Sequence, residues 1–225
     1  GGGADNVMNY FQQRLRVATK IAVADGVSIN VRNDFTEEIW GRNGQNSVRY
    51  FDDGTTAEFS FDKAYVEVAK DAYTLRLGQQ YFKVGKIGVV DHIGTGAYFA
   101  LKSIPLTLTF TQMDEGGSQD DLASTDRVVY SAQFGIKPIG GNVFVGYDDA
   151  PNANSESNLY VVGANFGFDL GAVKLMGELD IFGGAFNATT DYFGTQLYLD
   201  ASSKLSDNLT LGGIALYAAG DDTDV

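Results

Sequence analysis

The amino-acid sequence predicts an all-β chain of about twelve antiparallel strands, and three observations point to it. Apolar and polar residues alternate with a period of two, in runs of about ten residues, along most of the chain. Amphipathic helical spacing is hard to find anywhere. The composition, with 28 glycines, 3 prolines, 12 tyrosines and 15 phenylalanines, excludes collagen-like and disordered chains. We therefore expect residues 1–225 to form a single domain.

The strands can be followed in order from the first run, where Leu15, Val17, Ile21 and Val23 share one parity and polar residues share the other. This run breaks at Asp25-Gly26, a tight hairpin turn. The later runs keep the alternation, with apolar parities at Val27, Ile29, Val31 and Phe35; Tyr73, Leu75, Leu77 and Tyr81; Leu106, Leu108 and Phe110; Val128, Tyr130, Ala132, Phe134 and Ile136; Val143, Val145 and Tyr147; Tyr160, Val162, Ala164, Phe166 and Phe168; Val173, Leu175, Leu179 and Ile181; Phe193, Leu197 and Leu199; and Leu209, Leu211 and Tyr217.

One run departs from this pattern. Phe59 and Phe61 share parity with Lys63 and Glu67, which places apolar and charged residues on the same face. The segment 57–69 therefore requires a β-bulge or a change of facing.

Short and long connections alternate along the chain. The short turns are expected at Asp25-Gly26, Lys70-Asp71, Ile104-Pro105, Lys137–Gly141, Leu170-Gly171 and Ser206-Asp207. Longer polar connections are expected at Gly41–Thr56, Val84–Gly96, Asp114–Thr125, Asp149–Ser157 and, shorter, at Gly183–Thr190. Tight turns at one end and long loops at the other are typical of a transmembrane antiparallel up-and-down β-barrel, whose periplasmic turns are short and extracellular loops long.

The alternation has a physical cause in such a barrel. In hydrocarbon an open sheet edge would leave backbone groups unpaired, so the sheet closes, its apolar parity faces lipid and its polar parity faces water. A secreted β-sandwich or β-solenoid also alternates, but a sandwich buries its apolar parity. Glycines on the strands and aromatic residues near strand ends favour the barrel. These aromatic residues are Tyr10, Phe11, Trp40, Tyr73, Tyr81, Tyr98, Phe99, Tyr147, Tyr160, Phe168, Phe182, Tyr192 and Tyr217.

Both ends of the sequence fall on the side of the long connections. Complete bacterial barrels have an even strand number and carry both termini on the periplasmic side. We therefore expect this sequence to be part of a longer chain whose whole barrel has at least about fourteen strands. A missed strand, or loops assigned to the wrong side, remains the alternative.

Composition and charge exclude several classes of function. The formal net charge of −13 argues against nucleic-acid binding, which needs a basic surface. No cysteine is present, so thiol catalysis, disulfides and thiolate metal sites are absent. The single histidine, His92, is expected in a long loop with no nucleophile motif beside it. We predict a protein that is not an enzyme and that has no cofactor and no metal site.

Three short segments carry a family resemblance: Phe11-Gln12-Gln13-Arg14-Leu15-Arg16; Ala64-Tyr65-Val66-Glu67-Val68 followed by Leu75-Arg76-Leu77-Gly78-Gln79-Gln80-Tyr81-Phe82; and Ala215-Leu216-Tyr217-Ala218-Ala219-Gly220-Asp221-Asp222. On these segments the chain resembles Gram-negative outer-membrane porins, most specifically the alginate-export-like and related porins. The resemblance implies a water-filled channel for passive diffusion of small hydrophilic or charged solutes. It also implies an outer membrane of lipid and lipopolysaccharide, and an inward-folded loop that helps to set selectivity.

The polar parity supplies the candidate pore-lining residues: Arg14, Arg16, Lys20, Arg32, Asp34, Arg76, Lys102, Arg127, Lys174, Glu178, Asp180 and Asp200. Basic residues lead in the early strands and acidic residues in the late ones. Adjacent early strands would then form a cationic wall that biases ion selectivity. The alternative is that these charges pair with each other across strands and merely keep the lumen wet.

Other functions remain open beside a porin. A structural outer-membrane barrel that serves as sleeve or anchor for a partner protein would show the same alternation. A secreted β-sandwich adhesin would need no membrane. The transported solute is left open, and so is the assembly, for which a homotrimer and a complex with a partner protein are both considered.

Overall fold

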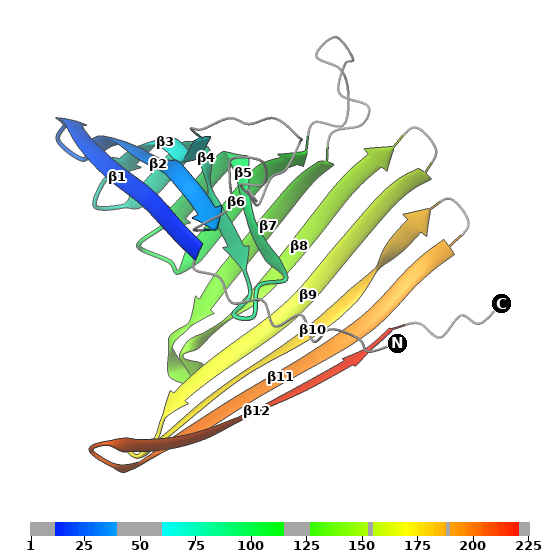
Figure 1. Ribbon diagram of the computed structural model, residues 1–225. Helices are drawn as coiled ribbons and strands as arrows, with labels where there is room; N and C mark the ends of the chain where they lie inside the picture. The colour runs from blue at the N-terminus through cyan, green and yellow to red at the C-terminus, as the bar shows by residue number, and fades with distance from the viewer. Residues whose placement is uncertain (1–11, 40–59, 115–126, 153–154, 188–189, 221–225) are drawn as a thin grey trace, which may run out of the picture.

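The chain forms one meandering antiparallel sheet of 12 strands, each hydrogen-bonded to the next in sequence (Figure 1). The computed structural model describes residues 12–39, 60–114, 127–152, 155–187 and 190–220. The strands are β1 (Gln12–Ala24), β2 (Val27–Ile39), β3 (Ser60–Ala69), β4 (Tyr73–Val84), β5 (Val90–Leu101), β6 (Leu106–Asp114), β7 (Arg127–Ile136), β8 (Gly141–Asn152), β9 (Ser155–Asp169), β10 (Val173–Asn187), β11 (Thr190–Ser206) and β12 (Leu209–Ala219). A 3₁₀ helix, η1 (Lys137–Ile139), joins β7 to β8. Over these ranges no helix is long and apolar enough to span a membrane.

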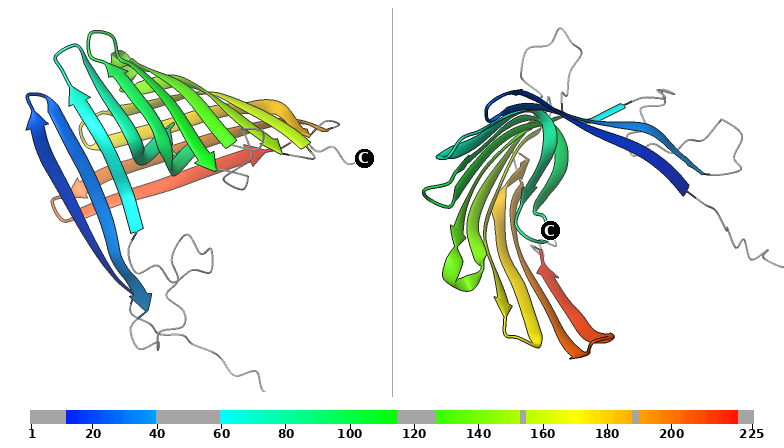
Figure 2. Two further views of the ribbon diagram at one scale, coloured as in Figure 1. Left: turned by 90° about the horizontal axis from the view of Figure 1, so that it is seen from above. Right: turned by 90° about the vertical axis from the view of Figure 1, so that its left-hand side faces the viewer.

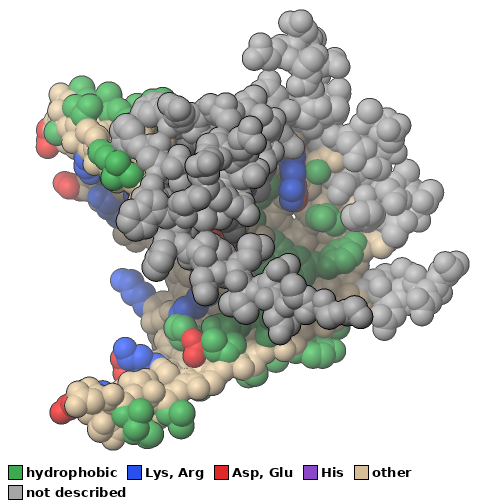
Figure 3. Space-filling view, in the orientation of Figure 1, with side chains coloured by type: hydrophobic (Ala, Val, Ile, Leu, Met, Phe, Trp, Pro, Cys, Tyr) green, Lys and Arg blue, Asp and Glu red, His purple; other side chains and the backbone are tan. Residues whose placement is uncertain are grey.

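The sheet curls so strongly that one face is concave and the other convex (Figure 2). Side chains crowd on the concave face and spread apart on the convex one. On β10 this alternation is sharp: Glu178 and Asp180 are 1% and 0% exposed, whereas Leu179 and Ile181 are 49% and 42% exposed. The apolar parity is thus the exposed, convex one, and hydrophobic side chains appear along the underside of the lower strands (Figure 3). A β-sandwich would bury that parity, so the sandwich alternative is wrong for this part of the chain.

The predicted all-β meander is confirmed, and the sheet is open. Within the described strands β1 pairs only with β2, and β12 pairs only with β11. The two edge strands are therefore not joined into a closed barrel here.

The short turns lie together at one end of the sheet, as predicted, at residues 25–26, 70–72, 102–105, 137–140, 170–172 and 207–208. Three of the predicted long connections are wrong. β5 begins at Val90, and the gaps between β8 and β9 and between β10 and β11 span only residues 153–154 and 188–189. Polar residues on the concave parity mimic loop composition, which explains these errors. The remaining two, at 41–56 and 114–125, lie almost wholly outside the described residues.

The predicted irregularity in the third run is a β-bulge at Asp62. Arg32 pairs with Lys63 and the next residue, Asn33, pairs with Phe61, so Asp62 is the extra residue. The bulge turns the Asp62 carboxylate to the concave face. The whole residue is 8% exposed. The bulge also restores the alternation, because Glu67 then faces the polar interior while Val66 faces out.

The hairpin formed by β4 and β5 leaves the sheet and folds into its concave side. β3 pairs with β4 only as far as Gln79, and β6 pairs with β5 only from Thr95 onward. Residues 80–94, which we call the inward arm, therefore form a two-stranded ribbon that pairs with no other strand among the described residues. Figure 2 shows this teal hairpin curling into the hollow of the sheet.

Two glycines form the bend at the base of the inward arm. Gly78 and Gly96 lie directly opposite each other on β4 and β5. Gly78 has a φ of +124°, which L side chains rarely adopt. A Cβ added to Gly96 would lie 1.9 Å from the carbonyl oxygen of Phe110, so β5 approaches β6 as only glycine permits.

We expect Gly96→Ala to lower the free energy of unfolding by about 1–3 kcal/mol, because the new methyl group must displace the backbone of β6. Thermal unfolding in detergent, followed by circular dichroism, measures the change. Gly213→Ala is the matched control, since a Cβ there meets nothing within 4 Å. Equal effects of the two substitutions would contradict the close approach.

Candidate functional site

The concave face of β1–β3 carries a network of ion pairs. Arg16 lies opposite Asp34 in the register of β1 and β2, and its Nε donates to Asp34 Oδ1 at 2.6 Å. Asp62, at the bulge, accepts from Arg32 Nε at 2.6 Å and lies 3.5 Å from Arg16. The bulge thus places one carboxylate between two guanidinium groups on neighbouring strands.

A second carboxylate continues this network toward β4. Glu67 accepts from Lys20 Nζ at 3.2 Å and from Arg76 Nε at 2.8 Å. The Arg76 guanidinium also lies over the ring of Tyr98, at 4.9 Å, and over that of Tyr65, at 5.7 Å. We call the side chains of Arg16, Lys20, Arg32, Asp34, Asp62, Glu67 and Arg76 the charge ladder.

The charge ladder differs from a purely cationic wall. Its four cations are interleaved with three carboxylates, two of which, Asp62 and Glu67, come from the strand whose pattern was irregular in the sequence. Cross-strand pairing, the alternative left open by the sequence, therefore describes this region. Arg14 lies two residues before Arg16 on β1, on the same parity.

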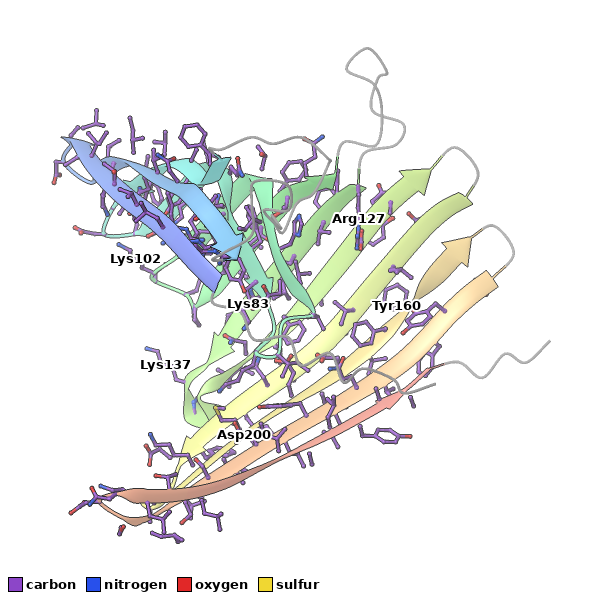
Figure 4. The ribbon with its side chains drawn as sticks, in the orientation of Figure 1. Lys83, Lys102, Arg127, Lys137, Tyr160 and Asp200 are labelled. Carbon is purple, nitrogen blue, oxygen red and sulfur yellow. The ribbon has the colours of Figure 1, made fainter. Side chains whose placement is uncertain are left out.

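The remaining candidate residues are spread over the concave face and its rims. Arg127 begins β7 and its Nε donates to Asp148 at 2.9 Å (Figure 4). Asp200 lies on β11, where it accepts from Tyr198 at 3.3 Å. Lys174 is exposed, at the second position of β10. Lys102, predicted to line the pore, lies in the turn that follows β5, and its ammonium group donates to the carbonyl of Lys70.

The inward arm rests on the concave face of β7–β10 through polar contacts. Glu178 accepts hydrogen bonds from the backbone N–H groups of Lys86 and Ile87, the latter at 3.2 Å, and from Asn165 Nδ2 at 3.0 Å. Gln133 Nε2 donates to the carbonyl of Lys83 at 3.0 Å. Glu178 and Asp180 were expected to line open water, but they are buried here.

An apolar cluster also stabilises the contact between the inward arm and the concave face. Val84 of the arm packs with Phe144 of β8 and Val161 of β9, and Val89, Val90 and Phe182 surround them. Phe182 was expected at a strand end, and no residue of this cluster was predicted from the sequence to be buried. The available signal was consecutive apolar residues, as in 143–145 and 160–162, which indicate a strand that is covered on both faces.

The convex face carries a row of aromatic side chains across neighbouring strands. Phe110 and Tyr130 are in register with ring centroids 5.3 Å apart, and Tyr130 and Tyr147 follow at 6.4 Å. Tyr160 continues the row on β9. Of the aromatic residues expected at strand ends, Tyr98 and Phe182 instead face the concave side, whereas Tyr10, Phe11 and Trp40 lie outside the described residues.

Among the residues that the structure describes, no three His, Cys, Asp or Glu side chains come close enough to hold a metal ion. His92, expected in a long loop, lies instead on β5 opposite Phe82.

Comparisons with known proteins add a structural likeness. No family model matches the chain. No curated protein matches it either. Among solved structures the chain is similar to OmpT, an outer membrane protein of Vibrio cholerae in trimer form after in-vitro folding, with 11% identity, a TM-score of 0.43, and coverage of 93% of this chain and 81% of that one. Because the identity and the TM-score are this low, the function is inferred from the residues of this chain alone.

We expect Asp62→Asn to lower the free energy of unfolding by about 2 kcal/mol, because two guanidinium groups lose their charged acceptor. Thermal unfolding in detergent measures the effect. Asp207→Asn is the control, since this turn carboxylate is 96% exposed and pairs with Lys204, three residues away. A stability loss at Asp207 equal to that at Asp62 would contradict the bridging role.

Proposed function

We propose that this chain forms the wall of an outer-membrane β-barrel channel through which small hydrophilic or charged solutes diffuse passively. One observation carries the proposal: the face of the sheet that is exposed on the outside is apolar, and the face that lines the hollow is polar and charged. This distribution is the reverse of that in a water-soluble sheet protein.

The side chains of the convex face favour contact with lipid. Large apolar side chains on this face are well exposed along strands from β1 to β12, among them Leu15, Leu77, Val145, Ile181 and Leu211, at 42–65%. In water a continuous apolar surface of this kind would drive association, whereas in a bilayer it is matched by acyl chains. Aromatic rows such as Phe110–Tyr130–Tyr147 suit the same surface.

The concave face supports passage of polar solutes. The charge ladder holds guanidinium and carboxylate groups in fixed positions by mutual hydrogen bonds, which keeps the wall polar without leaving its charges uncompensated. A wall of both signs attracts polar and zwitterionic solutes and orients them by their dipoles. The inward arm reduces the cross-section beside the opposite wall, in the place expected of an inward-folded segment.

A second candidate is a structural barrel that serves as sleeve or anchor for a partner. The apolar cluster of Val84, Phe144 and Val161 favours it, because this cluster fills part of the hollow. In that function the hollow would be occupied and no solute would cross.

Reconstitution into planar bilayers separates the two candidates. We expect discrete conductance steps for the channel, and none for a filled sleeve. Partition into a detergent phase should accompany either result, because the convex face needs apolar solvent. Recovery of the folded protein in detergent-free buffer would contradict the membrane placement.

We expect Lys20→Gln to shift the reversal potential in a salt gradient toward cation preference, because it removes a cation from the charge ladder and leaves Glu67 with Arg76 alone. The shift should be largest at low salt, where exposed charges are least screened. Lys204→Gln is the matched control: this lysine is equally exposed, at 58% against 64%, but pairs with Asp207 at the turn end. An unchanged potential for Lys20→Gln would dismiss the ladder as a selectivity element.

A further inference from the structure

Among the described residues, strand pairing joins the inward arm to the rest of the sheet only at its base. Within the part of the chain that the structure describes, β4 and β5 pair only with each other over residues 80–94, and the base is the bend at Gly78 and Gly96. Beyond that bend, the contacts with the opposite wall are the apolar cluster, the Gln133–Lys83 hydrogen bond and the carboxylate of Glu178. An element with one fixed end and a small docking surface can occupy two positions, seated and released.

Two carboxylates beneath the arm, Glu178 and Asp180, have opposite effects on the stability of the seated position. The Glu178 carboxylate has hydrogen-bond donors, because it accepts from two backbone N–H groups of the arm and from Asn165. Asp180, two residues later on the same face of β10, is 0% exposed, and no donor among the described residues reaches either of its oxygens. Burying a carboxylate without donors is unfavourable, whereas a charged acceptor of backbone N–H groups stabilises the contact.

Asp180 is held against apolar groups and a glycine. A Cβ on Gly163 would lie 2.4 Å from Asp180 Oδ1 and 2.2 Å from the tip of the Phe144 ring, so both side chains occupy the space that Gly163 leaves. Phe144 in turn packs on Val84 of the arm. When the arm lifts and Phe144 loses that cover, water can reach Asp180 and solvate it.

We propose that the inward arm is a gate that swings about Gly78 and Gly96, with Glu178 as the latch that holds it seated and Asp180 as the group that favours its release. The proposal rests on the proposed channel function only for what the gate controls. The motion itself is a property of the fold and can be measured without any channel.

The absence of cysteine makes a single introduced thiol a clean reporter. Val84→Cys places it on the arm at a side chain that is 0% exposed, so a maleimide can react only when the arm is released. In the folded protein in detergent, we expect Glu178→Gln to raise the labelling rate about tenfold or more, and Asp180→Asn to lower it by a similar factor. Circular dichroism verifies that the variants keep their strands.

Asp200→Asn is the matched control, because Asp200 is a carboxylate on the concave face of the next strand and contacts Tyr198 instead of the arm. It should leave the labelling rate unchanged. Two results would overturn the proposal: changes of the same sign for the variants at 178 and 180, or no change at either relative to Asp200→Asn.

A cross-link covers the case in which Glu178→Gln fails to fold. In Val84→Cys/Val161→Cys, oxidation should join the arm to β9, where the two native side chains pack together, and a reductant should release it. In bilayers we expect the oxidised protein to hold a single low conductance and the reduced protein to fluctuate. Identical conductance in both states overturns the gate, whereas thiol results as expected with no conductance at all would count against the channel and not against the moving arm.

Discussion

The strict alternation of side chains across a strand is the constraint on which this structure depends. One face of each strand meets apolar surroundings and the other meets water and charge, so a shift of one residue would exchange the two faces. The chain keeps this order through most of its twelve strands, and the bulge at Asp62 shows how it is kept. The extra residue, Asp62, restores the alternation of side chains in β3. Its carboxylate also bridges Arg16 and Arg32.

Charge in this wall is arranged by strand pairing. Arg16 meets Asp34 because they are direct partners in the register of β1 and β2, and Glu67 meets Arg76 because they are direct partners in that of β3 and β4. Cross-strand neighbours of opposite charge stabilise an antiparallel pair, so the same contacts hold the sheet together and set its electrostatic character. A net charge of −13 for the whole chain is therefore compatible with a locally balanced wall.

The sequence was sufficient for the strand order, for the turns and for which parity faces outward, because these features depend on local periodicity. Arg14, Arg16, Lys20, Arg32, Asp34 and Arg76 could be placed on one face for this reason. Tertiary contacts could not be read in the same way. The bend at Gly78 and Gly96, and the burial of Glu178 and Asp180, depend on a hairpin meeting strands far along the chain. The strand around His92 was missed because its polar and glycine residues have loop composition.

The seating of the inward arm has a consequence for the order in which the protein assembles. Almost every contact in the sheet joins strands that are consecutive in sequence, so the meander can grow hairpin by hairpin as its segments become available. The amide of Lys86, by contrast, meets a side chain 92 residues later. The arm can therefore reach its seated position only after β10 has supplied Glu178, which closes a much longer loop of chain than any hairpin of the meander does.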